Sequence, residues 1–340
     1  MNLPLRKLLR VSLRVATRAI WRVFLIGFVA WSTLAVFYSN LPNLGLRSAA
    51  AALFACVVMA LRLRIRPHWL ARWVVAGCCA AVVAWFFLIR PSNQRDWQPD
   101  VAVLPYADVQ GDQVAVHNIR NCDYRTESDY TVRHYDKTFD LAQLRSVDLY
   151  LVYWGSPLIA HTMLSFGFAD GSYLCFSIET RKEKGEAYSA IRGFFRQYEL
   201  TYVVGDERDL VRLRSNFRGE QVHLYHLQTD LPTARLVLLD YLEEVNRLKN
   251  QPEWYNALTS NCTTNIRGHT YPYARKSRWN WRLLVNGYVD ELAYSVGALD
   301  RSLPFKELKA RSLINDRAKA AGDAPDFSAR IRAGLPGFPL

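Results

Sequence analysis

Three long apolar stretches lie in the first quarter of the chain, and short polar segments separate them. They run from Val23 to about Leu41, from about Leu44 to Leu61 and from Trp73 to Ile89. These lengths are just sufficient for a helix to cross the hydrocarbon core of a bilayer. The second stretch is the weakest because it contains Arg47, which lies near one end and can extend toward the interface. We therefore predict three membrane helices.

Shorter runs rich in β-branched and aromatic residues dominate the rest of the chain, and such runs are typical of strands. The expected strands are 114–124, 147–154, 161–168, 172–179 and 222–227. Apolar residues recur at helical spacing in 234–250, which predicts an amphipathic helix. This mixture of strands and helices predicts an α+β domain after the membrane segments.

The positive charge of the chain is confined to the membrane region. The net charge is +12, and residues 1–95 contain 13 Lys or Arg and no Asp or Glu, so residues 96–340 carry only −1. Lys and Arg precede the first apolar stretch and separate the second from the third, which the positive-inside rule places in the cytoplasm. This pattern predicts a multi-pass protein of the bacterial inner membrane with its C-terminal part in the periplasm, and no nucleic-acid partner.

These patterns divide the chain into five parts. Residues 1–22 are expected to be a basic cytoplasmic N-terminus, and 23–90 a three-helix membrane anchor. Residues 91–105 are expected to be a linker, 106–300 a periplasmic domain and 301–340 a C-terminal extension.

Cys262 differs from the other five cysteines in its surroundings. Three of those five lie in the apolar helices, and Cys122 and Cys175 fall in expected strands, where a buried inert thiol is the usual state. Whether Cys122 and Cys175 pair is left open. Small polar residues flank Cys262 at the start of an expected helix, and a helix N-terminus favours a thiolate. The spacing of Cys and His residues fits no zinc site, so we expect neither a metal nor a cofactor.

His161 is the best candidate for a base because of the expected hairpin. If Ala169-Asp170-Gly171 is a three-residue loop, Phe168 pairs with Ser172 and His161 lies opposite Glu179. A two-residue turn would place Thr162 opposite Glu179 instead. The first register supplies a carboxylate that can orient the imidazole, although a His opposite a Glu is more often a surface pair.

Two runs, AHTMLSFGFADGSYLCFSIETR and WYNALTSNCTTNIRGH, resemble the periplasmic domain of Lnb-type lipoprotein N-acyltransferases. The similarity extends from about Asn118 to about Arg330. That family is similar to a circularly permuted papain-like (NlpC/P60-like) thiol fold. The resemblance implies that Cys262 in NCTT is the nucleophile, His161 in AHTMLSF the base and Glu179 in SIETR the acidic partner.

The resemblance also implies a reaction. Cys262 would take an acyl chain from a phospholipid, and the amine at the N-terminus of a lipoprotein would accept it. The backbone N–H of Cys262 would bind the oxyanion together with Asn261 or Tyr153.

Arginines that cluster in the sequence are candidates for a phosphate headgroup, although ion pairing is their more common role. They are Arg181, Arg196, Arg208, Arg212 and Arg214.

Two other functions remain open at this point. The same three residues would serve a periplasmic cysteine amidase or peptidase that uses water as the acceptor and acts on peptidoglycan or protein. A membrane-anchored scaffold without catalysis is the second alternative. The presence of Cys262, His161 and Glu179 together argues against the scaffold, because a degenerate enzyme is expected to lose at least one of them.

Overall fold

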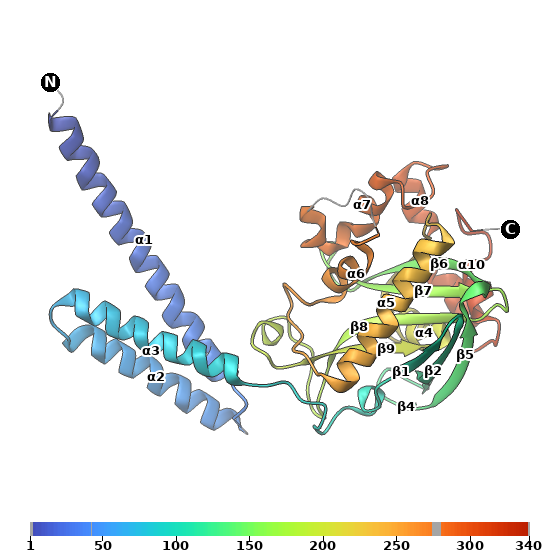
Figure 1. Ribbon diagram of the computed structural model, residues 1–340, viewed down its shortest axis with the longest axis horizontal. Helices are drawn as coiled ribbons and strands as arrows, with labels where there is room; N and C mark the ends of the chain where they lie inside the picture. The colour runs from blue at the N-terminus through green and yellow to red at the C-terminus, as the bar shows by residue number, and fades with distance from the viewer. Residues whose placement is uncertain (1–2, 42, 274–279, 339–340) are drawn as a thin grey trace. The chain divides into compact units, whose positions relative to one another are not determined.

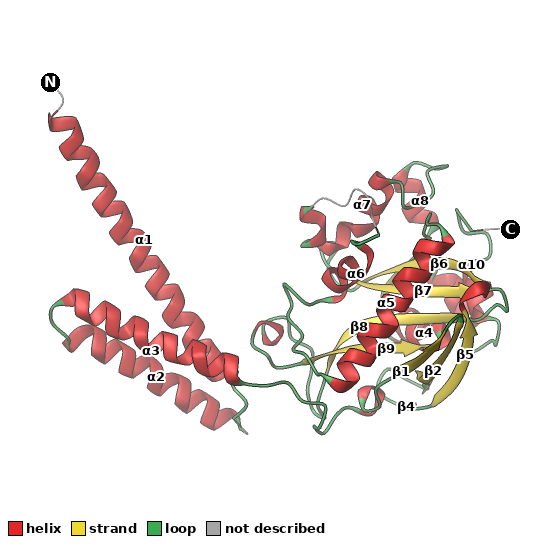
Figure 2. Cartoon of the chain, viewed as in Figure 1, coloured by secondary structure: helices red, strands yellow, loops and turns green. Residues whose placement is uncertain are grey.

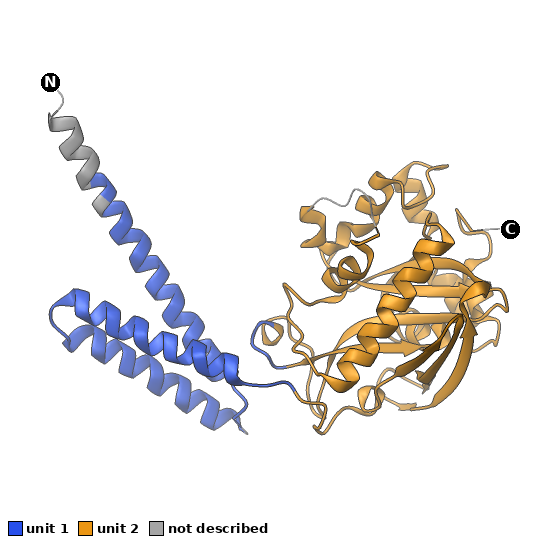
Figure 3. Cartoon of the chain, viewed as in Figure 1, with its two compact units in different colours: residues 1–91, 194–197 blue, residues 92–193, 198–340 orange. Residues whose placement is uncertain are grey.

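The computed structural model describes residues 3–41, 43–273 and 280–338 (Figure 1). The chain forms two compact units, which Figure 3 distinguishes by colour. Unit 1 consists of residues 1–91 and 194–197, and unit 2 of residues 92–193 and 198–340. Unit 1 is almost entirely helical, whereas unit 2 combines a large sheet with helices (Figure 2). The α+β prediction and the three apolar helices before it are confirmed.

The three helices of unit 1 are α1 (Leu3–Phe37), α2 (Leu44–Arg64) and α3 (His68–Leu88). All three are long and apolar enough to cross a membrane, and in α1 the apolar part covers Val15–Phe37. The helix α1 begins at Leu3 and continues through residue 22. No Gly or Pro interrupts residues 5–26, so the basic segment and the apolar segment form one helix.

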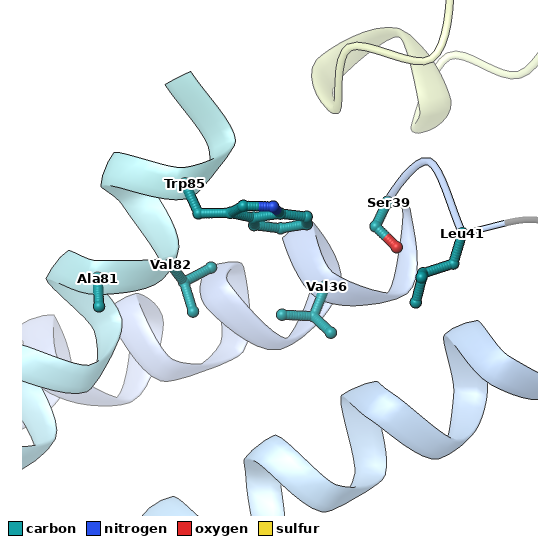
Figure 4. Close-up of a pocket in the computed structure, with 6 residues that line it drawn as sticks. All are labelled: Val36, Ser39, Leu41, Ala81, Val82 and Trp85. Atoms are coloured by element: carbon teal, nitrogen blue, oxygen red, sulfur yellow. The ribbon is translucent and has the colours of Figure 1, made fainter. Parts of the chain in front are cut away.

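An apolar pocket of about 370 Å³ lies between α1 and α3 (Figure 4). Its lining side chains come from the end of α1 and the turn after it, and from the second half of α3. They are Val36, Ser39, Leu41, Ala81, Val82 and Trp85. None of the six is titratable, so the pocket offers a surface for hydrocarbon and no acid–base group.

Unit 2 is built on an eight-stranded, mainly antiparallel sheet in the order β1-β2-β9-β8-β7-β6-β10, with β5 paired to β2. The strands are β1 (Tyr106–Gln110), β2 (Gln113–Arg120), β5 (His134–Asp140), β6 (Leu144–Tyr153), β7 (Ala160–Phe168), β8 (Tyr173–Arg181), β9 (Glu199–Gly205) and β10 (Gln221–His226). A separate pair is formed by β3 (Asp123–Tyr124) and β4 (Tyr130–Thr131). The central strands β6 to β9 are almost completely buried and carry apolar residues on both faces, with buried polar side chains at a few positions.

Helices cover both faces of this sheet. The first face packs against α5 (Leu231–Asn250), which crosses the sheet in Figure 1, and against α6 (Cys262–Thr270). The helices α7 (Val289–Val296) and α8 (Phe305–Arg311) follow along the chain. The second face packs against α4 (Glu207–Arg212), α9 (Asn315–Ala321) and α10 (Phe327–Arg332). A turn of π-helix, Leu213–Phe217, continues α4.

The expected linker is a packed part of unit 2. Trp97 is buried, and the carbonyl oxygens of Val101 and Ala102 accept hydrogen bonds from Arg181 at 2.9 and 2.8 Å. Backbone carbonyls buried in this way need such donors, and Arg181 supplies them from β8. The expectation of a free stalk over residues 91–105 is therefore corrected.

Residues 301–340 also belong to the core of unit 2, which corrects the expectation of an extension. Ile314, Phe327 and Ile331 are buried against the second face of the sheet. Their apolar side chains cover a surface that would otherwise be exposed to water. The described part of this segment therefore completes the fold.

Arg332 of α10 ties this segment to the sheet through two buried carboxylates. Its Nη2 lies 2.7 Å from Oδ2 of Asp148 and 2.6 Å from Oε1 of Glu207. Burial raises the pKa of Glu207, but the charge of Arg332 outweighs burial and holds that pKa below its usual value. Removing the arginine would leave Asp148 and Glu207 buried without this cation.

Arg332→Ala is expected to lower the free energy of unfolding by about 3–5 kcal/mol, because two buried carboxylates lose the cation that lies between them. The measurement is urea denaturation of the detergent-solubilised chain. Arg330→Ala is the matched control on the same helix, since Arg330 forms an exposed pair with Asp326 and its loss should cost about 1 kcal/mol or less. Equal effects of the two substitutions would contradict this role for Arg332.

Candidate functional site

The hairpin of β7 and β8 has the register expected from the three-residue loop. Phe168 N donates to Ser172 O at 2.9 Å, and Gly171 has φ 79°, a conformation that glycine adopts without strain. The ladder pairs Gly167 with Tyr173 and ends at Met163 and Ser177. Continuing this register places Glu179 opposite His161, as the sequence predicted.

A hydroxyl group connects the two predicted residues. Nε2 of His161 lies 2.7 Å from Oγ of Ser177, and that hydroxyl donates to Oε1 of Glu179 at 2.7 Å. Ser177 and Glu179 are two residues apart on β8, so both side chains lie on the same face of the sheet. The structure therefore brings His161 and Glu179 together through Ser177.

Arg214 fixes the charge of Glu179. Its Nη2 donates to the same Oε1 at 2.8 Å from the turn of π-helix after α4. Burial raises the pKa of Glu179, but the positive charge of Arg214 outweighs burial and holds the pKa well below its usual range. Glu179 is thus an ionised hydrogen-bond acceptor at neutral pH.

These hydrogen bonds determine which nitrogen of His161 is free. Because the Ser177 hydroxyl gives its single proton to the Glu179 carboxylate, its oxygen must accept a proton from Nε2–H. Burial, followed by the positive charge of Arg214, lowers the pKa of His161 to about 3. The imidazole is therefore neutral near pH 7, and Nδ1 carries the lone pair that a general base needs.

Cys262 is the first residue of α6, and Asn261 before it forms a complete capping box. Oδ1 of Asn261 accepts from Thr264 N at 3.0 Å, and Oγ1 of Thr264 accepts from Asn261 N at 2.9 Å. The N–H groups of the first helical turn have no acceptor within the helix, so the N–H of Cys262 points out of the N-terminus of α6. A negatively charged atom there is favoured by the helix dipole.

The thiol lies in an aromatic environment. Cys262 is only 7% exposed and belongs to the core on the first face of the sheet. Tyr188, Tyr241 and Tyr255 lie close enough to interact electrostatically with it. Burial, and then Cys262, raises the pKa of Tyr255 above its usual range, so its hydroxyl stays protonated.

The chain segments that carry Cys262 and His161 lie side by side, but their side chains point to different faces. Oγ1 of Thr162 lies 3.3 Å from Oγ1 of Thr263, which joins β7 to α6. Because neighbouring residues of a strand face opposite sides, His161 points toward the second face with Ser177. In the part of the chain that the structure describes, the polar contact of the thiol is with Thr263 Oγ1, at 3.9 Å. The structure does not bring the thiol into hydrogen-bond contact with His161.

The two residues considered for the oxyanion have other hydrogen-bond partners. Nδ2 of Asn261 donates to Ala257 O at 2.8 Å, in addition to the capping bond of its oxygen. The hydroxyl of Tyr153 donates to Gly287 O at 2.7 Å. Asn261 is thus a helix cap and Tyr153 a support of the segment 286–288, and the N–H of Cys262 is the donor directed out of α6.

Sequence reasoning missed Ser177 and Asn286, and it considered Arg214 for a phosphate headgroup and not as the partner of Glu179. Nδ2 of Asn286 donates to Oγ1 of Thr263 at 2.9 Å and to Ala160 O at 2.7 Å, so it holds the start of β7 against α6. Ser177 lies two residues before Glu179, and this spacing on a strand is a signal that could have identified it. Arg214 and Asn286 are distant along the chain and carried no local signal.

The other two cysteines outside the apolar helices are free, buried and poorly suited to catalysis. Burial raises the pKa of Cys122 to about 12, and it raises that of Cys175 well above its usual value. A thiol of this kind is not nucleophilic near pH 7. Among the described residues, no group of three or more His, Cys, Asp or Glu is arranged to hold a metal ion.

Residues 130–287 match the family model described as the Lnb N-terminal periplasmic domain. This match supports the resemblance noted in the sequence and assigns this segment to the Lnb-type family. The matched segment contains the five residues predicted for the site, while the three apolar helices and α8 to α10 lie outside it. No curated protein and no solved structure matches the chain.

Proposed function

We propose that this membrane-anchored Lnb-type protein is a thiol acyltransferase. It moves an acyl chain from a phospholipid, through a thioester on Cys262, to the amine at the N-terminus of a lipoprotein. The observation that carries the proposal is the position of Cys262 at the capped N-terminus of α6, among three tyrosines and within the Lnb-type segment. The order of the elements, with the His strand β7 before the Cys helix α6, supports a permuted papain-like arrangement.

In the proposed first step, Nδ1 of His161 removes the proton from Cys262 Sγ. The thiolate attacks an ester carbonyl of the phospholipid, and the N–H of Cys262 stabilises the resulting oxyanion. The C–O bond then breaks, and the lysolipid oxygen leaves with the proton from His161. The thioester retains the acyl chain.

In the second step, the lipoprotein amine attacks the thioester carbonyl. His161 accepts a proton from the amine, the C–S bond breaks and an amide forms. The proton returns to the Cys262 thiolate, so the enzyme ends as it began. Water in place of the amine would give the hydrolytic alternative.

The first step requires the imidazole and the thiol to approach one another. The β7–β8 ladder ends at Met163 and Ser177, but His161 is buried and still paired with Val152 of β6, so the approach requires this end of β7 to rearrange. Catalytic hydrogen bonds are often long before substrate binds and tighten in the complex. Ser177 and Glu179 hold the tautomer that leaves Nδ1 free during this approach.

The membrane anchor supports this choice of substrates. The apolar helices of unit 1 would place the protein in the inner membrane as a multi-pass protein, with unit 2 in the periplasm. Phospholipid and lipoprotein are both held in the same membrane. Tethering the enzyme there raises the effective concentration of each substrate.

The test is intact mass spectrometry of the full chain in detergent after incubation with phospholipid and no amine. Wild-type protein is expected to gain one acyl-sized adduct that hydroxylamine removes, with release of lysolipid. Cys262→Ala should gain none, whereas Cys56→Ala, which changes an exposed cysteine of α2, should behave as wild type. A folded wild-type protein that yields neither adduct nor lysolipid would refute phospholipid as the donor and favour peptide or amide substrates.

A further inference from the structure

A second cavity, of about 540 Å³, lies in unit 2 between the turn that follows β6 and the start of β10. Its walls are residues 153–157, residues 218–221, His223 and Lys309. Unlike the pocket in unit 1, it combines charged side chains with exposed backbone. This cavity is therefore suited to a polar ligand.

Two cations and one carboxylate line the cavity. Arg218 and Lys309 are the cations, and both are only partly buried. The carboxylate, Glu220, is already 3.3 Å from Nη1 of Arg214. Burial, and then the charge of Lys309, lowers the pKa of His223 to about 4, so its ring is neutral at pH 7. Both cations are in ion pairs, Arg218 with the exposed Glu127 at 3.0 Å and Lys309 with Asp290, and each keeps part of its side chain accessible.

The cations are held in place and the backbone beside them is open. Nζ of Lys309 lies 2.8 Å from the Tyr153 hydroxyl and 2.7 Å from Oδ2 of Asp290. Gly155 and Gly219 have φ of 72° and 66°, and no atom lies within 4 Å of the position that a Cβ would take. A ligand can thus approach the main chain at both glycines.

Hydrogen bonds connect the cavity to the candidate site. Tyr153, which lines the cavity, donates to Gly287 O at 2.7 Å. The preceding residue, Asn286, bonds to Thr263 next to Cys262 and to Ala160 next to His161. The positive charge of Arg218 also contributes to the lowered pKa of His161. These bonds link the lining of the cavity to the segments that carry Cys262 and His161.

We propose that this cavity binds the phosphodiester of the glycerophospholipid that donates the acyl chain, with Arg218 and Lys309 as its cationic contacts. This inference rests on the proposed function and assigns the headgroup site of the same reaction. A phosphodiester carries one negative charge, which the exposed parts of the Arg218 guanidinium and the Lys309 ammonium can contact. Only a few covalent bonds separate the phosphate from the ester carbonyl of a glycerophospholipid, so the proposal requires that ester to reach Cys262 from this cavity.

The arginines suggested by the sequence are engaged elsewhere. Arg208 and Arg212 both pair with Asp323. Arg214 donates to Glu179, as described above. Arg218, four residues further along, lines the cavity and pairs with the exposed Glu127 at 3.0 Å. Arginine suits this role because its planar guanidinium can donate two hydrogen bonds to a phosphate.

The test is isothermal titration of the full-length Cys262→Ala protein in a neutral detergent. The probes are glycerophosphoglycerol, which is a deacylated phosphodiester headgroup, inorganic phosphate and glycerol. Glycerophosphoglycerol is expected to bind, and Arg218→Gln to weaken binding about 10- to 100-fold, because a hydrogen bond to a charged group is lost. Arg133→Gln, which changes an exposed arginine away from the cavity, should leave binding unchanged.

Glu220→Gln is a control for misfolding, because its expected effect on binding is opposite to that of a damaged protein. Removing the only carboxylate of the lining should strengthen phosphodiester binding several-fold, and a damaged protein would bind less. The proposal would be overturned if glycerophosphoglycerol did not bind, or if Arg218→Gln bound it as tightly as the protein with Arg218. Binding of inorganic phosphate as tight as that of glycerophosphoglycerol would overturn the headgroup assignment and indicate a site for free phosphate. Because these variants lack Cys262, the outcome does not depend on thiol chemistry.

Discussion

Replacing Cys262 with serine is expected to lower the rate of acyl transfer by about 10⁴- to 10⁶-fold, the size of loss typical when a catalytic nucleophile is removed. A hydroxyl is a much weaker nucleophile than a thiolate near pH 7, and His161 alone does not compensate for that difference. The N–H of Cys262 is a backbone group, so the serine variant keeps the oxyanion donor. The measurement is the rate of amide formation on a synthetic lipopeptide in the presence of phospholipid.

The control for this substitution is Cys175→Ser. Cys175 is buried in β8 on the face opposite to α6, so its replacement should affect stability more than rate per folded molecule. Acyl transfer that survives in Cys262→Ser at more than about one tenth of the wild-type rate would exclude Cys262 as the nucleophile.

Replacing His161 with alanine is expected to lower the rate by about 10²- to 10⁴-fold, which is the usual contribution of a general base. Because burial and the charge of Arg214 lower the pKa of His161 to about 3, the wild-type base is neutral from pH 5 to 8. Protonation of His161 should therefore cause no loss of rate between pH 7 and 5. In His161→Ala the thiol must lose its proton without a base, so the residual rate should rise with hydroxide concentration.

Ser177→Ala extends this test to the hydrogen-bond chain. Without the hydroxyl, His161 loses the acceptor for Nε2–H, and the pH profile should change while the protein remains folded. The conservative variant Ser177→Thr keeps a hydroxyl at this position and should restore much of the activity.

If His161→Ala transfers acyl chains as fast as wild type, the base is not His161, and the thiol is activated from its own face of the sheet, where the three tyrosines lie.

The polar network around Glu179 also explains why β7 and β8 remain polar on one face at this end of the sheet. His161, Ser177 and Glu179 are buried or nearly buried, and each finds a hydrogen-bond partner in another. Arg214 balances the carboxylate. A buried charge without such a partner would cost several kcal/mol, as a rough estimate. The network is therefore stable in its present form and available to orient His161.

The amino-acid sequence by itself determined the elements whose patterns are local. Three apolar runs of sufficient length specified the membrane helices, and the Asp170-Gly171 turn specified the register of the hairpin because glycine is needed at its positive φ. The small polar residues before Cys262 specified the start of α6 through side-chain capping. Each of these signals acts over a few residues, which is why it can be read without a structure.

Only the tertiary structure decided features that depend on contacts distant along the chain. Strands β5 and β9 were not expected, because β5 carries charged residues and β9 is defined by its neighbours β2 and β8. The role of Arg214 depends on a π-helical turn that places it beside Glu179. The packing of α10 on the sheet depends on Arg332 meeting two carboxylates from other elements. Burial and charge pairing are properties of the assembled core, and no local pattern of residues encodes them.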